Sequence, residues 1–516
     1  MTDRMAQVEQ WGIFEANWDA PDEGNPYQDT ELAAEFRLND RSVTVGGFYD
    51  GSGRYRIRFM PDETGEWGYE TFSNRKPLDG RRGAFRCLPP SAGNRGPVRV
   101  SGDYHFAYAD GTAYYPIGTT SYGWAQQKEE LAGRTLDALR GSPFNKLRMC
   151  ALPHYSAFSE RHIACFPFPG EPPAGWDFSR MNPDYFRMLD LRLQALLELG
   201  IQADLILFHP YQRPWKFDAM GAKAEDAYVR YVVNRYGAYR HVWWSIANEF
   251  DFIQGKTPED WDRICRLMHE SDPYGRLCSI HNGYILYEHW KPWITHASVQ
   301  DSLAVTRPGR AVVLRNAYRK PVVYDEVGYE GNLPFYWGDL SPEELTHRLW
   351  QGAVEGTYVG HGEVLRPAGM PIDRVWTGIG GTLGGRSVER FAFFRKVLEE
   401  GPNEALNPVD EWRCTGIAGI PGSFYLLYFG KASPTEWRFE LPCRSAELPE
   451  GAKFVVERID AWNMTIERCE ETFECCKANE YVYKDIYNRA VALPGKPFVA
   501  LRITRLPEEA PQAADS

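Results

Sequence analysis

Basic residues are in the minority in this chain. Lys and Arg number 58 against 70 Asp and Glu, which leaves a formal charge of −12 over 516 residues. Nucleic acids and anionic membranes are bound through clustered Lys and Arg side chains. The charge balance therefore argues against both as partners, and the 43% of hydrophobic residues fits an ordinary globular protein.

Long apolar runs are also lacking. No stretch of about 18 uncharged apolar residues is available for a transmembrane helix, and residues 1–7 lack the apolar core of a secretory signal. The ten cysteines include no Cys-x-x-Cys pair, and Cys475 and Cys476 are too close for an ordinary disulfide. These absences predict free thiols and a cytoplasmic location.

Three familiar catalytic motifs are missing as well. The chain has no His-Glu-x-x-His zinc motif and no Gly-x-Ser-x-Gly nucleophile elbow. The glycine-rich run 378–385 lacks the Lys-Ser/Thr of a phosphate-binding loop, so we expect a loop at the mouth of a site. We predict no metal and no cofactor, although eleven histidines keep a metal-dependent barrel hydrolase open as an alternative.

The pattern along the chain divides it into three regions. Residues 1–100 contain short alternating runs split by Gly, Pro, Asn and Asp, and similar runs return in residues 403–516, which end in a polar tail. Such runs predict an antiparallel β-sandwich at each end of the chain. The clearest runs are 34–38, 55–59 and 67–72 in the first region, and 423–429, 454–459 and 498–503 in the last.

In the middle region, residues 101–402, predicted strands alternate with predicted helices. Asn182, Thr257 and Ser341 each precede a proline, as is typical of a helix N-cap followed by proline at the first helical position. The fold class is therefore α/β, a (β/α)8 TIM barrel flanked by N-terminal and C-terminal β-sandwich domains. Eight candidate strands begin near residues 115, 144, 201, 242, 278, 297, 321 and 357.

Two of these strands end in a glutamate. The apolar run 243–247 leads into Asn248 and Glu249, and the run 321–325 leads into Glu326. The carboxyl ends of barrel strands meet at one mouth. A retaining glycosidase needs two carboxyl groups there about 5–5.5 Å apart, one as acid/base and one as nucleophile. Asn248 is placed to hydrogen-bond a sugar hydroxyl beside them.

Other strand ends carry side chains suited to sugar binding. A guanidinium on the second strand could hold a nucleophile ionised, imidazoles and hydroxyls bind sugar hydroxyls, and aromatic rings stack on the apolar face of a sugar. For each histidine a structural role is the alternative, and for each tryptophan it is core packing. The predicted substrate-binding residues are Arg148, His209, Asn248, His281, Trp376, Tyr211, Trp124 and His154.

These motifs carry a family resemblance. The runs 115–120, 244–249, 320–330 and 374–378 resemble the DUF4038 barrel family, which includes apiosidase-like enzymes, within the retaining glycoside hydrolase clan. The flanking regions resemble its companion domains DUF5060 and DUF5605, so the resemblance covers almost the whole chain. It implies Glu249 as acid/base and Glu326 as nucleophile. Asp325 and Val327 stand where the family often has Gly and Pro, which leaves Asp325 and Glu330 as alternative nucleophiles.

The leading hypothesis is a retaining, exo-acting O-glycosidase that hydrolyses small glycosides or oligosaccharides by double displacement. The alternatives are a catalytically inactive carbohydrate-binding protein on the same fold and the metal-dependent hydrolase. The partner expected is a carbohydrate substrate, with no nucleic acid and no membrane. The β-domains are also candidates for building a homo-oligomer.

Overall fold

The computed structural model describes residues 5–155, 163, 165–171, 175–212, 215–301, 307, 309–366, 375–402, 404–409, 416–442 and 447–507. The chain forms two units. The first holds Met1–Tyr114, Gly118–Gln300 and Arg366–Leu383, and the second holds Tyr115–Ile117, Asp301–Leu365 and Gly384–Ser516. Arg374, Cys414, Cys443 and most of the predicted tail, residues 508–516, lie outside the described residues.

The first unit begins with a seven-stranded sheet in the order β1-β7-β6-β3-β4-β5-β2. Phe14 of β2 stacks on Phe85 of β7 with ring centroids 4.1 Å apart, although β2 and β7 lie near opposite ends of that order. The sheet therefore curls around an apolar core, as expected of alternating strands with one buried face. The strands are β1 Ala6–Glu9, β2 Phe14–Asp19, β3 Leu32–Leu38, β4 Arg41–Tyr49, β5 Arg54–Phe59, β6 Gly65–Ser73 and β7 Arg82–Leu88.

A parallel sheet follows in the same unit, in the order β11-β12-β15-β16-β17. Every residue of β15 and β16 is buried, as is typical of parallel strands covered on both faces. His281, two residues after β17, forms a parallel bridge with Ser298 of β18 and so links these two strands. The strands are β11 Gly118–Thr120, β12 Lys146–Cys150, β15 Gln202–Phe208, β16 Val242–Ala247, β17 Cys278–Ser279 and β18 Ala297–Gln300.

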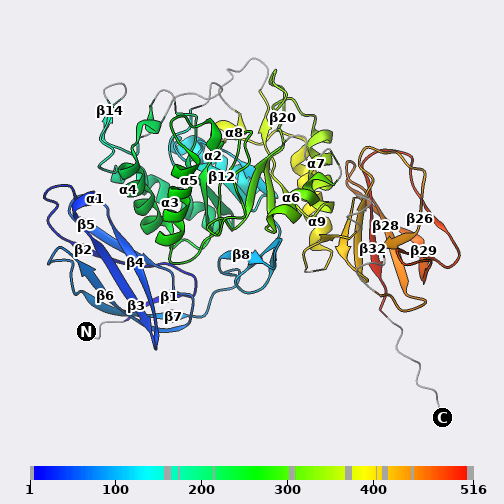
Figure 1. Ribbon diagram of the computed structural model, residues 1–516, viewed down its shortest axis with the longest axis horizontal. Helices are drawn as coiled ribbons and strands as arrows, with labels where there is room; N and C mark the ends of the chain where they lie inside the picture. The colour runs from blue at the N-terminus through cyan, green and yellow to red at the C-terminus, as the bar shows by residue number, and fades with distance from the viewer. Residues whose placement is uncertain are drawn as a thin grey trace, which may run out of the picture. The chain divides into compact units, whose positions relative to one another are not determined.

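Helices cover one face of this sheet (Figure 1). The rings of Tyr228 and Trp261 pack on Phe208 of β15 with centroids 5.6 and 6.2 Å away. The side chains of Asn182 and Thr257 cap two of these helices as predicted, and Thr257 forms a reciprocal capping box with Asp260. The helices are α2 Glu129–Arg140, α3 Pro183–Glu198, α4 Ala222–Tyr236 and α5 Pro258–Ser271.

On the other face of the sheet, charged side chains lie near the beginnings of the strands. Lys146 of β12 lies 2.6 Å from Asp204 of β15, and its ammonium group lies 5.5 Å from the centre of the Trp243 ring. Both members of this ion pair are almost fully buried. Because side chains alternate along a strand, Arg148 shares this face with Lys146, two residues earlier.

The second unit contains two further strands of the predicted set, β19 Val322–Glu326 and β21 Tyr358–Val359, which pair in parallel. Ser341 accepts a hydrogen bond from the backbone N–H of Glu344 and caps α7, as predicted. The helices of this unit include α6 Arg310–Tyr318, α7 Pro342–Val354 and α9 Ser387–Glu399.

The second unit also contains an eight-stranded sheet with its own apolar core. Its central strand β32 pairs antiparallel with both β25 and β28, which fits the strand patterns predicted there. The strands in their hydrogen-bonded order are β23 Asn407–Pro408, β24 Ile417–Ile420, β25 Phe424–Tyr428, β32 Val499–Arg505, β28 Lys453–Asp460, β29 Thr465–Lys477, β30 Val482–Asp485 and β27 Glu440–Pro442.

The protein is thus a mixed α/β protein with sheet-rich flanking regions, and a strand occurs at each of the eight predicted places. The closure of these strands into one barrel and the boundaries at residues 100 and 402 stay predictions. Eight cysteines lie in the part of the chain that the structure describes, and all are free thiols.

A network of buried charges ties the first sheet to α3 and α4. Arg235 of α4 lies 2.9 Å from Asp50 and 2.6 Å from Asp190 of α3, and Arg58 of β5 lies 3.0 Å from Asp190. Burial disfavours ionisation of Asp190, but Arg58 and Arg235 outweigh it and lower the pKa of this carboxyl. Two buried guanidinium groups therefore share one carboxylate.

We predict that Asp190→Asn lowers the unfolding free energy by about 3–5 kcal/mol, because it leaves two buried arginines short of a counter-charge. The matched control is Asp184→Asn on the same helix, where an exposed carboxylate pairs with Arg187 at 2.7 Å. That variant should lose less than about 1 kcal/mol. Thermal or denaturant unfolding at neutral pH measures both, and similar losses in the two variants would contradict the prediction.

Candidate active site

The backbone of Glu249 adopts a left-handed conformation. Glu249 follows β16 with φ 43° and ψ 54°, and it opens the short 3-10 turn η2, Phe250–Phe252. This conformation costs a residue with a Cβ about 1–2 kcal/mol. Neighbouring strands hold it in place, since Asn248 N–H donates to Phe208 O at 2.9 Å and Phe250 N–H donates to His281 O at 3.0 Å. Strained residues held this way are often found at active sites.

Three side chains from different strand ends donate hydrogen bonds to the Glu249 carboxylate. The Tyr211 hydroxyl and the Asn248 amide donate to Oε2, the latter at 3.5 Å. The Gln300 amide, at the end of β18, donates to Oε1 at 3.2 Å. Glu249 is only 5% exposed, so these bonds fix the orientation of a nearly buried carboxylate.

Arg148 determines how the amide of Asn248 is turned. Its buried guanidinium donates to Asn248 Oδ1 and to the Tyr122 hydroxyl, the latter at 3.3 Å. Because an arginine can only donate, the oxygen of the Asn248 amide must face it, and the nitrogen faces Glu249. The structure thus brings together three predicted site residues, namely Arg148, Asn248 and Glu249.

His154 lies at the centre of a group of rings. It stacks on Tyr122 with centroids 4.7 Å apart and an interplanar angle of 15°. Its ring centroid also lies 5.3 Å from that of His209 and 5.1 Å from that of Tyr211. The ring group thus supports both Tyr211, which contacts Glu249, and Tyr122, which contacts Arg148.

His209 is buried and neutral at physiological pH. Burial lowers the pKa of His209 to about 4, although a hydrogen bond to the Leu152 carbonyl at 3.3 Å acts in the opposite direction. Since a carbonyl only accepts, Nε2 carries the proton of the neutral ring. This places His209 as a packing and hydrogen-bonding partner of the site, and its contact with substrate stays a prediction.

His281 acts on Glu249 through Gln300. Its ring nitrogens lie 2.8 Å from Ser298 Oγ and 3.3 Å from Gln300 Oε1. The side chain of Asn282 accepts from the backbone N–H of Gln300 at 3.1 Å. His281 is fully buried, so the structure gives it a positioning role beside the carboxylate.

Trp124 and Trp376 are both buried in the hydrophobic core of the first unit. Trp376 opens the helical turn α8, Trp376–Ile379, and its indole N–H donates to Thr119 Oγ1 at 2.9 Å. The placement matches the core-packing alternative, with each ring enclosed by protein. Substrate stacking by either tryptophan stays a prediction.

Gln300, which contacts Glu249, and Tyr122, which contacts Arg148, are missing from the predicted substrate-binding set. Gln300 lies at a predicted strand end, which is the signal that points to it. Tyr122 lies two residues beyond Thr120, the last residue of β11, and only its contacts with Arg148 and His154 reveal its place.

In the second unit, Glu326 is the last residue of β19 and is 9% exposed. Its backbone carbonyl accepts from Asp301 N–H at 3.3 Å. The alternative candidate Asp325 is also buried, at 4% exposure. Glu249 and Glu326 belong to different units.

The other alternative nucleophile, Glu330, is engaged in the fold. Its carboxylate accepts from the backbone N–H of Arg386 at 2.8 Å and of Ser387 at 2.9 Å, at the start of α9. A carboxylate at a helix N-terminus satisfies unpaired amides and favours the helix dipole. These contacts explain Glu330 without a catalytic role.

Glu363 forms a carboxyl pair with Glu330. The strands β20 Glu330–Gly331 and β22 Glu363–Val364 pair so that the two glutamates are opposite each other. Gly384 and Gly385 each donate a backbone N–H to Glu363 at 2.8 Å. A Cβ on Gly385 would lie 2.6 Å from an oxygen of each glutamate, so a larger residue there would have to displace both carboxylates. These contacts hold the end of the glycine-rich run.

Burial raises the pKa of Glu363 to about 7, and the charge of Glu330 adds to the effect while the two glycine amides oppose it. Between the ordinary pKa of about 4.5 and the raised value, the folded protein holds a proton that the unfolded chain releases. Stability should therefore fall as pH rises through this window, by up to about 3 kcal/mol, and stay constant above it.

The test compares the wild type with Glu363→Gln, which stays neutral at every pH. On going from about pH 5 to about pH 8, the wild type should lose stability relative to the variant, measured as the difference in unfolding midpoint. A difference between the two proteins that is the same at both pH values would contradict the assignment.

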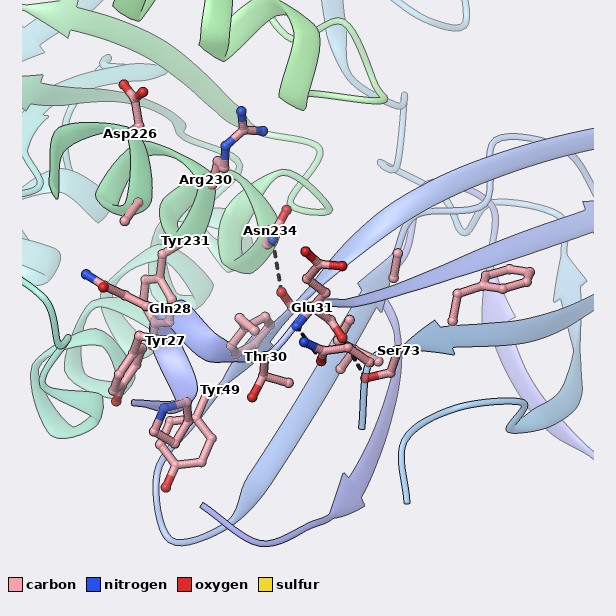
Figure 2. Close-up of a pocket in the computed structure, with 18 of the residues that line it drawn as sticks. Tyr27, Gln28, Thr30, Glu31, Tyr49, Ser73, Asp226, Arg230, Tyr231 and Asn234 are labelled. Carbon is pink, nitrogen blue, oxygen red and sulfur yellow. Dashed lines mark hydrogen bonds between the residues drawn. The ribbon is translucent and has the colours of Figure 1, made fainter. Parts of the chain in front are cut away.

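A large cavity lies elsewhere in the first unit, between the first sheet and α4 (Figure 2). Its volume is about 860 Å³, and its walls include Tyr27, Glu31, Tyr49 and Arg230. All lining residues come from residues 26–79 or from α4. The lining includes neither Glu249 nor any side chain that donates to it, so this cavity is separate from the hydrogen-bond network of Glu249.

Among the described residues, no group of three or more His, Cys, Asp and Glu side chains has the arrangement to hold a metal ion. Within the same residues, every helix is too short or too polar to cross a membrane.

Three family models match the chain in order. A domain of unknown function, DUF5060, matches residues 7–74, the apiosidase-like catalytic domain matches residues 101–362, and a second domain of unknown function, DUF5605, matches residues 412–504. The predicted resemblance is thus confirmed for all three regions. No protein with a curated description matches the chain.

The chain is also similar to solved structures of glycoside hydrolases. A "putative glycoside hydrolase from Bacteroides vulgatus ATCC 8482" is 39% identical, covers 97% of this chain and 100% of its own, and superposes with a TM-score of 0.93. A family 5 glycoside hydrolase from the same organism covers 80% of this chain and 93% of its own, with a TM-score of 0.56. At 13% identity, this second likeness concerns the fold alone.

Proposed function

The chain belongs to the apiosidase-like family, and we propose from this that it is a retaining, exo-acting O-glycosidase built on a (β/α)8 barrel. Glu249 is the acid/base and Glu326 the nucleophile. The observation that carries the proposal is the strained, hydrogen-bonded Glu249, which stands where the family resemblance places an acid/base. Few structural needs explain a left-handed glutamate that three side chains hold in place.

The proposed reaction has two displacements. The Glu326 carboxylate attacks the anomeric carbon while Glu249 gives its proton to the departing glycosidic oxygen, which leaves a glycosyl ester on Glu326. Glu249, now ionised, takes a proton from water, and the water oxygen attacks the same carbon and releases Glu326. Two inversions give net retention, and they require the two carboxyl groups to lie about 5–5.5 Å apart.

The side chains around Glu249 position these groups. Arg148 holds Asn248 so that its amide nitrogen can donate to a sugar hydroxyl next to the reacting carbon. Tyr211 and Gln300 orient the Glu249 carboxylate toward the leaving oxygen. Exo action on small glycosides, a cytoplasmic location and an oligomer built through the β-regions are parts of the same proposal.

The first test screens nitrophenyl furanosides and pyranosides for a hydrolysed sugar and then compares Glu249→Ala with Glu326→Ala. Each variant should lose about 10³-fold or more of the wild-type rate of turnover, since each lacks one of the two essential carboxyl groups. The difference between them shows when azide is added. Glu326→Ala should yield a glycosyl azide of inverted configuration, and Glu249→Ala one of retained configuration.

The stereochemistry of the azide products, read by NMR, separates the two roles. Identical configurations from both variants would contradict the assignment. Loss of wild-type activity with a chelator would favour the metal-dependent alternative, and sugar binding without any turnover would favour the inactive binding protein.

A further inference from the structure

Large apolar side chains are exposed in one loop of the first unit, which follows β17. Tyr284 is 78% exposed and the adjacent Ile285 is 66% exposed. Single exposed apolar residues are common on protein surfaces, but a group of them on one ordered segment marks a surface that binds something.

The start of this loop is held by a carboxylate. Asp251 accepts hydrogen bonds from the backbone N–H groups of Gly283, Tyr284 and Ile285 at 2.5, 2.7 and 2.9 Å. Charge-assisted bonds of this kind are among the stronger hydrogen bonds in proteins. The backbone that carries the two exposed side chains is therefore fixed.

The far end of the loop is held by α5. Lys291 lies 2.6 Å from the Asp262 carboxylate, and the Tyr287 hydroxyl donates to the same group. The Trp293 indole N–H donates to the Tyr287 oxygen at 3.0 Å. Because the loop is anchored at both ends, a ligand that binds its exposed side chains pays little to order the backbone.

Phe252 connects this loop to the acid/base. Its backbone N–H donates to the carbonyl of Glu249 at 2.9 Å. Its ring packs against Tyr284 with centroids 5.1 Å apart and an interplanar angle of 62°. A Cβ on Gly283 would lie only 2.4 Å from the Phe252 ring, so the absence of a side chain at Gly283 permits this packing. Phe252 is itself 36% exposed.

Phe252, Tyr284 and Ile285 thus form an apolar shelf beside Glu249. We propose that this shelf binds the aglycone of the substrate and that it favours aglycones with a flat apolar face. The inference rests on the proposed function. A general acid protonates the leaving oxygen, so the side of the site that carries it faces the leaving group. The ligand class is an aromatic ring or the C–H face of a second sugar, either of which can stack on exposed rings.

The experiment uses two substrates that share the sugar found in the screen, a nitrophenyl glycoside and the glycosyl fluoride. Both have a good leaving group, but fluoride offers the shelf no surface. Tyr284→Ala should lower kcat/KM for the nitrophenyl glycoside about tenfold, while kcat/KM for the fluoride changes less than about twofold. Tyr284→Phe keeps the ring and should behave as the wild type on both substrates.

Tyr487→Ala is the matched control, since Tyr487 is 68% exposed in the second unit. It should change neither rate. Equal losses on both substrates for Tyr284→Ala, or no loss at all, would overturn the shelf as an aglycone site and leave the proposed function standing. If the wild type is a dimer, and Tyr284→Ala is a monomer without a selective loss of activity, the shelf is a contact between copies of the chain and the aglycone proposal is overturned. If the wild type hydrolyses none of the glycosides, the proposed function and the shelf both fail.

Discussion

The left-handed backbone of Glu249 is the constraint on which the candidate site depends. β16 ends at Ala247, directly before Asn248 and Glu249, and a regular continuation of the strand would keep the following side chains alternating across the sheet. The reversal instead starts a short turn whose amides bond to the neighbouring strand ends. Its cost is small beside the stabilisation from the parallel sheet that surrounds it, so the fold can maintain it permanently. The carboxylate is consequently held in one orientation, as its proposed role in proton transfer requires.

Much of the site consists of groups that orient other groups. Arg148 turns the amide of Asn248, His281 supports Gln300, and the ring of His154 packs between Tyr122 and His209. Most of these side chains are buried, and His154 and Gln300 are partly buried. In such surroundings an unsatisfied polar atom is costly and a satisfied one is rigid. A site of this construction keeps its geometry through many weak contacts, and the effects of removing neighbouring members should not be additive.

The sequence predicts well whatever depends on local pattern. The caps at Asn182, Thr257 and Ser341 rest on a few adjacent residues, and the eight strand positions rest on short apolar runs, so both sets could be located in advance. Contacts such as Gln300 with Glu249 depend on the register between strands far apart in the chain, which composition and periodicity do not encode. Trp376 illustrates the same limit: its position after the last strand fits a stacking platform, but the structure pairs its N–H with Thr119 inside the core. The engagement of Glu330 by the start of α9 likewise requires knowledge of where residues 386 and 387 lie.

The charge network of Arg58, Asp190 and Arg235 limits where the chain can be truncated without loss of stability. The first hundred residues supply Arg58 and Asp50, whereas α3 and α4 supply their buried counter-charges. A fragment that starts at the catalytic region would leave Arg235 without Asp50 and would uncover the apolar surface around it. The N-terminal sheet is therefore a structural part of the catalytic region and not an independent module. A fusion protein that contains the catalytic region would need to include the N-terminal sheet as well.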